Sequence, residues 1–169
     1  MDIRIFGLAD DSIVDGPGIR FTTFVQGCPH HCPGCHNPGS HDFSGGTVMD
    51  TADIIRKLSS NPLLDGLTLS GGEPLCQPEA CLELANAAHA HHLNVWCYTG
   101  FTLDALLKEN NPARMALLRA ADVLVDGRFE LANRSLSLLY RGSSNQRLID
   151  LKQTLASGSI VLWQPEKWC

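Results

Sequence analysis

Strand-like and helix-like hydrophobic patterns alternate along the chain. Residues 20–26 alternate and are rich in β-formers, and they run from a Gly-Pro-Gly turn almost directly into Cys28. This pattern predicts a strand that ends at the cysteine. Further strands are predicted over 66–70, 93–99 and 122–126, and helices over 51–59, 78–91, 102–109 and 112–120. The apolar run 159–163 fits an additional strand, whose position the pattern does not give.

The order of these elements predicts an α/β fold. Strands that alternate with helices form right-handed βαβ units with a parallel sheet, and ligands bind at the carboxyl ends of its strands. A closed eightfold barrel takes about 250 residues. The 169 residues therefore fit a partial (β/α) barrel with a mostly parallel sheet of about five or six strands. No repeat, low-complexity tract or linker divides the chain, so residues 1–169 are expected to form a single domain.

Composition narrows the function classes. With 44 % hydrophobic residues, the chain can form a hydrophobic core of ordinary size. Its net charge of −5 argues against electrostatic binding of nucleic acid. No apolar run approaches the length of a membrane span, and the first residues lack the basic segment of a signal peptide. The protein is therefore expected in the cytoplasm, without a nucleic-acid or membrane partner.

Three of the seven cysteines form a cluster with C-x3-C-x2-C spacing, namely Cys28, Cys32 and Cys35. In a reducing cytosol such clustering indicates metal ligation. Three thiolates are one short of the four ligands of a cubic iron–sulfur cluster, and they would leave one iron open for chemistry. The spacing therefore favours a reactive [4Fe-4S] cluster.

A structural zinc site is the alternative interpretation of the same loop. A Cys3His set is common for zinc. Four nearby histidines could supply the fourth ligand: His30, His31, His36 and His41. The isolated cysteines at 76, 81 and 97 fit ordinary packing positions, and no role follows for Cys169.

A second motif, Gly71-Gly72-Glu73-Pro74, follows the strand predicted over 66–70. Two glycines allow a ligand to approach the backbone, and a carboxylate can accept from an ammonium group. Taken alone, the motif is typical of an ordinary turn. Its predicted position, on the sheet edge that also holds the cysteine loop, favours a binding site for the amino-acid part of a ligand.

Together these motifs resemble those of the radical S-adenosylmethionine enzymes, and the resemblance covers most of the chain. The Asp-Gly-Pro-Gly-Ile-Arg segment at 15–20 and Cys-His-Asn at 35–37 resemble the activating proteins of glycyl-radical enzymes. Segments 96–100, 125–129 and 140–147 resemble the activators of anaerobic ribonucleoside-triphosphate reductase. One departure is His36, where those activators often have tyrosine and the pyruvate formate-lyase activators have histidine.

The resemblance implies an activating enzyme, an oxidoreductase that contains a [4Fe-4S] cluster and binds S-adenosylmethionine. One electron from a flavodoxin- or ferredoxin-type donor would cleave the sulfonium to give a 5′-deoxyadenosyl radical. That radical would then install a glycyl radical on anaerobic ribonucleoside-triphosphate reductase. A pyruvate formate-lyase type partner and a non-catalytic zinc module stay as the alternatives.

Site residues follow from the matched motif positions. The three cysteines would bind the cluster, and no further catalytic side chain is implied. The residues implied to bind S-adenosylmethionine are Gly34 and His36 at the adenine, Gly71, Gly72 and Glu73 at the methionine end, and Asp126 and Arg128 at the carboxylate or ribose. Asp15 and Arg20 would support the cluster end, and residues 141–147 would contact the partner or close the barrel.

Overall fold

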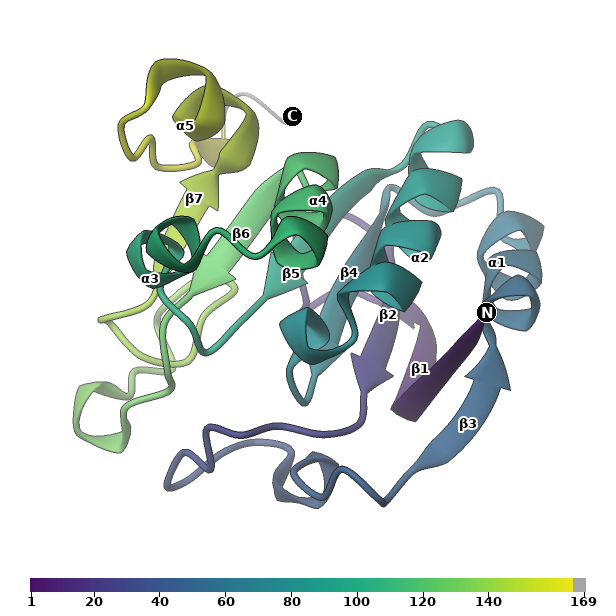
Figure 1. The fold of residues 1–169 in the computed structure, drawn as a ribbon, viewed down its shortest axis with the longest axis horizontal. Coiled ribbons are helices and arrows are strands. Elements are labelled where there is room, and N and C mark those ends of the chain that lie inside the picture. Colours follow the sequence, from purple (N-terminus) through teal and green to yellow (C-terminus); the bar gives the residue numbers. More distant parts are fainter. Residues whose placement is uncertain (166–169) are drawn as a thin grey trace.

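The computed structural model describes residues 1–165, which fold around one seven-stranded sheet (Figure 1). The strand order is β3-β1-β2-β4-β5-β6-β7. The strands are β1 (Asp2–Ser12), β2 (Arg20–Val25), β3 (Thr47–Asp50), β4 (Gly66–Gly71), β5 (Asn94–Tyr98), β6 (Val123–Asp126) and β7 (Arg147–Asp150).

The sheet is parallel in its middle and antiparallel at its edges. β2, β4, β5 and β6 pair in parallel, whereas β1 pairs antiparallel with β2 and β3, and β7 pairs antiparallel with β6. The expected α/β fold with a parallel centre is confirmed. The expected number of five or six strands is too low, because the pattern did not reveal β1, β3 and β7. The curvature of a partial barrel stays a prediction.

All eight elements predicted from the pattern are present, with ends within one residue of expectation. The helices are α1 (Thr51–Ser60), α2 (Pro78–Ala90), α3 (Leu103–Glu109), α4 (Pro112–Ala120) and α5 (Leu151–Ser157), of which α5 was not predicted. Side chains of Asp50, Thr102 and Asn111 accept hydrogen bonds from backbone amides of the first turns of α1, α3 and α4. The apolar run 159–163 forms no strand, because Leu162 makes only an isolated bridge to Ile149.

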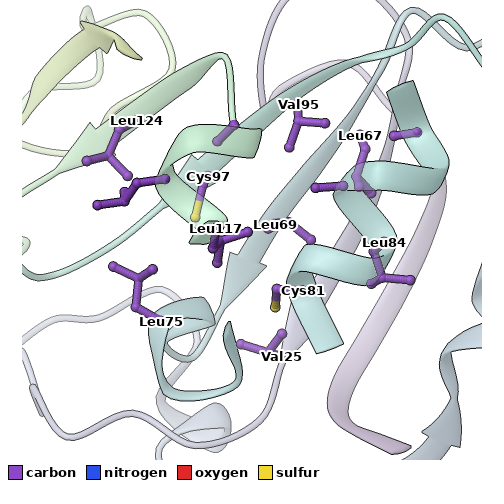
Figure 2. Close-up of a cluster of buried hydrophobic side chains, with 14 of the residues drawn as sticks. Val25, Leu67, Leu69, Leu75, Cys81, Leu84, Val95, Cys97, Leu117 and Leu124 are labelled. Atoms are coloured by element: carbon purple, nitrogen blue, oxygen red, sulfur yellow. The ribbon is translucent and has the colours of Figure 1, made fainter. Parts of the chain in front are cut away.

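One face of the sheet, here called the helix-covered face, packs against the helices. Along β4 to β6, alternate residues such as Leu69, Cys97 and Leu124 point to this side and join the main core (Figure 2). All five helices add apolar side chains to the same core, and Leu84 of α2 and Leu117 of α4 are examples. Figure 1 shows α2 and α4 lying across this face.

The other face, here called the loop-covered face, is covered by aromatic residues that loops supply. Trp96 of β5 contacts Tyr140 and Trp163 edge to face, at ring centroid distances of 5.3 Å and 5.0 Å. The guanidinium of Arg20 lies 5.6 Å from the centroid of the Trp96 ring and donates to Thr68 Oγ1 at 2.7 Å. Burial lowers the pKa of Arg20 to about 10. This face is therefore more polar than the helix-covered one.

Every helix within residues 1–165 is too short or too polar to cross a lipid bilayer.

Candidate active site

The cysteine loop begins where β2 ends and folds back on itself. Gly27 donates its amide to Ser40 O at 2.7 Å, and Cys28 donates its amide to His41 O at 3.1 Å. The side chain of Gln26 donates to Gly39 O at 3.0 Å. These bonds close the segment between residues 26 and 42 into one loop at the carboxyl end of β2.

The three clustered cysteines line a single pocket of about 150 Å³. Cys28 is buried, while Cys32 and Cys35 are partly exposed. Burial raises the pKa of the Cys28 thiol, and backbone hydrogen bonds from His30 and His31 oppose the rise. Within residues 1–165, no three His, Cys, Asp or Glu side chains are grouped to hold one metal ion. A four-iron cluster takes one cysteine per iron, so its ligands need not meet at a point.

Gly71 and Gly72 line the same pocket and bring the end of β4 against the end of β2. The Gly72 amide donates to Val25 O at 2.7 Å. A Cβ on Gly72 would lie 2.4 Å from Gly27 O, and one on Gly71 would lie 2.5 Å from Val25 N. Gly71 also has a φ of +92°, which favours glycine. Both glycines are therefore required by the backbone that leads to Cys28.

The Glu73 carboxylate is fully buried and does not line the pocket. It accepts hydrogen bonds from Leu75 N at 3.0 Å, Thr99 Oγ1 at 3.0 Å and Gly100 N at 2.9 Å. His30 Nε2 lies 2.7 Å from Glu73 Oε2. The carboxylate thus joins the cysteine loop to the ends of β4 and β5.

Gly34 and His36 lie on the exposed side of the loop and face the segment that follows β6. The His36 ring is 5.3 Å from the Phe129 ring, and both side chains line the cysteine pocket. Gly34 has a φ of +76°, and a Cβ there would lie 3.0 Å from Leu131 and 3.3 Å from Phe129. The loop after β6 therefore forms the opposite wall of the pocket.

Asp126 and Arg128 line a neighbouring pocket of about 610 Å³, which shares Gly100 and Gly127 with the cysteine pocket. Asp126 is 1 % exposed and binds the Arg147 guanidinium, with Oδ2 to Nη2 at 2.6 Å and Oδ1 to Nε at 3.0 Å. Arg128 is exposed. The structure therefore places these two residues beside the cysteine pocket and not in its lining.

Asp15 and Arg20 do not contact the cysteine loop directly. Asp15 accepts from Thr22 Oγ1 at 3.2 Å, and its carbonyl accepts from Thr68 Oγ1 at 2.8 Å. Both residues lie on the loop-covered face, and Asp15 lines a cavity of about 470 Å³ together with His36 and Asn37 of the cysteine loop. Their side chains support the strands that carry the loop.

The segment 141–147 closes over the end of β6. Gln146 donates its side-chain amide to Gly127 O at 3.0 Å and lines the cysteine pocket. Arg141 donates to Gln146 O at 2.5 Å, which holds the segment in a compact turn.

Several pocket residues, among them Asn37, Ser70 and Gly127, were not identified from the sequence as site residues. Tyr98, Thr99 and Gly100 lie at the end of β5, and Phe129 follows β6. Ligands bind at the carboxyl ends of parallel strands, so this rule could have identified the residues that follow each predicted strand. His30 was considered only as a zinc ligand, and the structure pairs it with Glu73 instead.

Comparison with known proteins identifies the family of the chain. Residues 14–149 match the family model described as a 4Fe-4S single cluster domain. This match favours an iron–sulfur site over the zinc alternative. The fold is similar to that of QueE from Escherichia coli, with a TM-score of 0.50, 12 % identity and coverage of 75 % of this chain and 70 % of that one.

Similar proteins named anaerobic ribonucleoside-triphosphate reductase-activating protein occur in bacteria and a phage. The protein of Haemophilus influenzae is 38 % identical over 144 residues, covering 79 % of this chain and 89 % of that protein. The Escherichia coli protein is 39 % identical over 142 residues (79 % and 90 %), and that of enterobacteria phage T4 is 34 % identical over 143 residues (80 % and 86 %). The resemblance inferred from the motifs is confirmed, and the chain belongs to the family of anaerobic ribonucleoside-triphosphate reductase-activating proteins.

Proposed function

We propose that this protein binds a [4Fe-4S] cluster and S-adenosylmethionine and installs a glycyl radical on anaerobic ribonucleoside-triphosphate reductase. The observation that carries the proposal is one pocket at the carboxyl ends of parallel strands. Its lining includes Cys28, Cys32 and Cys35 together with Gly71 and Gly72. The names of the relatives favour the reductase over a pyruvate formate-lyase type partner.

The donor set of the pocket fits a cluster with one open iron. Three thiols line it, and its lining contains no fourth cysteine. Cys32 and Cys35 are partly exposed, which leaves room for a ligand on their side of the pocket, whereas Cys28 is buried. We assign the three cysteines as ligands of three irons.

The neighbouring surfaces fit the remaining parts of S-adenosylmethionine. We assign the methionine end to the backbone at Gly71 and Gly72, because both glycines line the cysteine pocket. The adenine is assigned to the wall formed by His36 and Phe129, against which Gly34 lies, because flat rings pack well against aromatic side chains. Asp126 and Arg128 then lie beside the pocket, in the lining of the larger cavity.

When bound, the cluster and S-adenosylmethionine would supply a one-electron cleavage of the sulfonium. Together with a hydrogen atom taken from a glycine Cα of the partner, this cleavage would yield methionine, 5′-deoxyadenosine and a glycyl radical. The residues of this chain bind and orient, and no side chain has to act as general base. Tyr98, Phe129 and Gln146 wall the pocket and limit access of water to it. An electron donor of flavodoxin or ferredoxin type completes the proposal.

The proposal is tested with the anaerobically reconstituted protein. We expect about four irons per chain, and 5′-deoxyadenosine that forms only with reductant and S-adenosylmethionine. With the reductase added, a glycyl-radical signal is expected in its electron paramagnetic resonance spectrum. Deoxyadenosine without that signal on the reductase would assign the chemistry to a different partner. A loaded cluster that cleaves no S-adenosylmethionine would contradict the proposal.

A further inference from the structure

The Glu73 carboxylate has its hydrogen-bonding capacity occupied by the protein itself. An ionised carboxylate offers about four acceptor sites. Leu75 N uses Oε1, while Thr99 Oγ1, Gly100 N and His30 Nε2 converge on Oε2. The residue has no exposed surface. The carboxylate is therefore better placed to hold protein segments together than to receive the ammonium group of a ligand.

His30 lies between Cys28 and Cys32, lines the cysteine pocket and is held by contacts at the ends of β4 and β5. Its side chain is 4 % exposed, and its ring packs edge to face on Phe101 with a centroid distance of 4.6 Å. Gly100 makes room for the imidazole, because a Cβ there would lie 2.4 Å from its Cδ2. The His30 side chain thus packs against the residues that follow β5 and is hydrogen-bonded to the Glu73 carboxylate.

A second connection joins the same segments through the backbone. The Glu73 amide donates to Gly27 O at 2.8 Å, directly before Cys28. The loop is thus attached to Glu73 on both sides of this first cysteine, once by its backbone and once by the His30 side chain. Within the same loop, the Asn37 amide donates to Cys35 Sγ at 3.4 Å, so a backbone amide of the loop already contacts a ligand sulfur.

We propose that the His30–Glu73 hydrogen bond is a positioning contact that fixes the cysteine loop, so that backbone amides of the loop donate to ligand sulfurs and set the reduction potential of the cluster. The proposal rests on the proposed function, because it concerns the same cluster. Hydrogen bonds to ligand sulfurs raise the potential of an iron–sulfur cluster by stabilising its more negative, reduced form. A loop that loses this anchor is expected to hold the cluster at a more negative potential.

The test compares three variants of the reconstituted protein by iron content and by midpoint potential, measured in a titration followed by electron paramagnetic resonance. His30→Phe keeps a ring but removes the donor to Glu73. His30→Gln restores a donor at a similar reach. His92→Asn is the matched control, since the His92 side chain is exposed just after α2, outside the cysteine loop, and asparagine tolerates its φ of 61°. Circular dichroism verifies folding in each case.

We expect a negative shift of the potential in His30→Phe, a return toward the wild-type value in His30→Gln and no shift in His92→Asn. A wild-type potential in a fully loaded His30→Phe protein would overturn the inference. If His30→Phe takes up no iron, the iron content and potential of His30→Gln test the inference instead. A loaded His30→Gln protein with wild-type potential supports the contact, whereas loss of iron in both folded variants contradicts it. Failure of the wild-type protein itself to load a cluster would count against the proposed function instead.

Discussion

The two faces of the sheet differ in what holds them together and in what they can do. The helix-covered face is apolar and continuous, with Leu69, Cys97 and Leu124 fully buried against the helices. The loop-covered face holds a buried arginine, Arg20, and a smaller aromatic group around Trp96. The first face therefore provides most of the hydrophobic stabilisation, since that scales with buried apolar area.

The candidate site lies where the loop-covered face reaches the carboxyl ends of the strands. Ser70 and Tyr98 point to this face and line the cysteine pocket. Polar groups there are held by individual hydrogen bonds, such as those of Arg20 and Glu73. Stability and chemistry are thus separated in space, so substitutions on the two faces should affect different measurements.

The largest effect is expected from Cys32→Ala. We expect cleavage of S-adenosylmethionine to fall to background while the melting temperature of the metal-free protein is unchanged, because Cys32 is partly exposed. Cys97→Ala is the counterpart on the helix-covered face and should keep cleavage but lower stability by about 1 kcal/mol. Cleavage at the wild-type rate by Cys32→Ala would refute its assignment as a ligand.

Leu69→Ala should destabilise the fold strongly, since Leu69 is fully buried in the main core. We expect a loss of about 2–5 kcal/mol in the free energy of unfolding, measured by denaturant titration. Leu63→Ala is the control, because Leu63 is 70 % exposed and should change stability by less than about 0.5 kcal/mol. Equal effects of the two substitutions would argue against the core described here.

Two threonine-to-valine substitutions compare the faces directly. Thr68→Val removes the acceptor of Arg20 Nε and should cost about 1–3 kcal/mol, because a buried donor loses its partner. Thr23→Val should be neutral or stabilising, since the buried Thr23 hydroxyl has no hydrogen-bond partner among the described residues. The measurement is again denaturant unfolding. A larger loss for Thr23→Val than for Thr68→Val would contradict this interpretation.

The smallest effect concerns the thiol of Cys76, which ends a short 3-10 turn between Glu73 and α2. Burial and the negative charge of Glu73 raise the pKa of Cys76 to about 11. The thiolate is the reactive form, so alkylation at pH 8 should be slow and should accelerate as the pH rises toward that value. Mass spectrometry follows the modification, with the denatured protein as reference. Equal rates in the folded and denatured protein at pH 8 would be inconsistent with the raised pKa.

The sequence predicted the central elements well because their hydrophobic periods are clear and their ends carry capping residues. It did not reveal β1, since only Ile3 and Ile5 of that strand are buried. β3 and β7 have four residues each, too few to show a period. The unpredicted α5 follows β7 immediately.

The motifs also predicted that the cysteines and glycines share one site, and the structure places them in one pocket. The roles of these residues stay proposals. Contacts between distant residues could not be predicted, because no local pattern reports them. Glu73 and His30 are 43 positions apart, and Asp126 and Arg147 are 21 apart. Cys169 lies outside the described residues.

The most direct test of the account is anaerobic turnover by the reconstituted protein. With iron, sulfide, reductant, S-adenosylmethionine and the reductase, the account predicts 5′-deoxyadenosine together with a glycyl radical on the reductase, and neither product with Cys32→Ala. A wild-type protein that holds its cluster but forms no deoxyadenosine would contradict it.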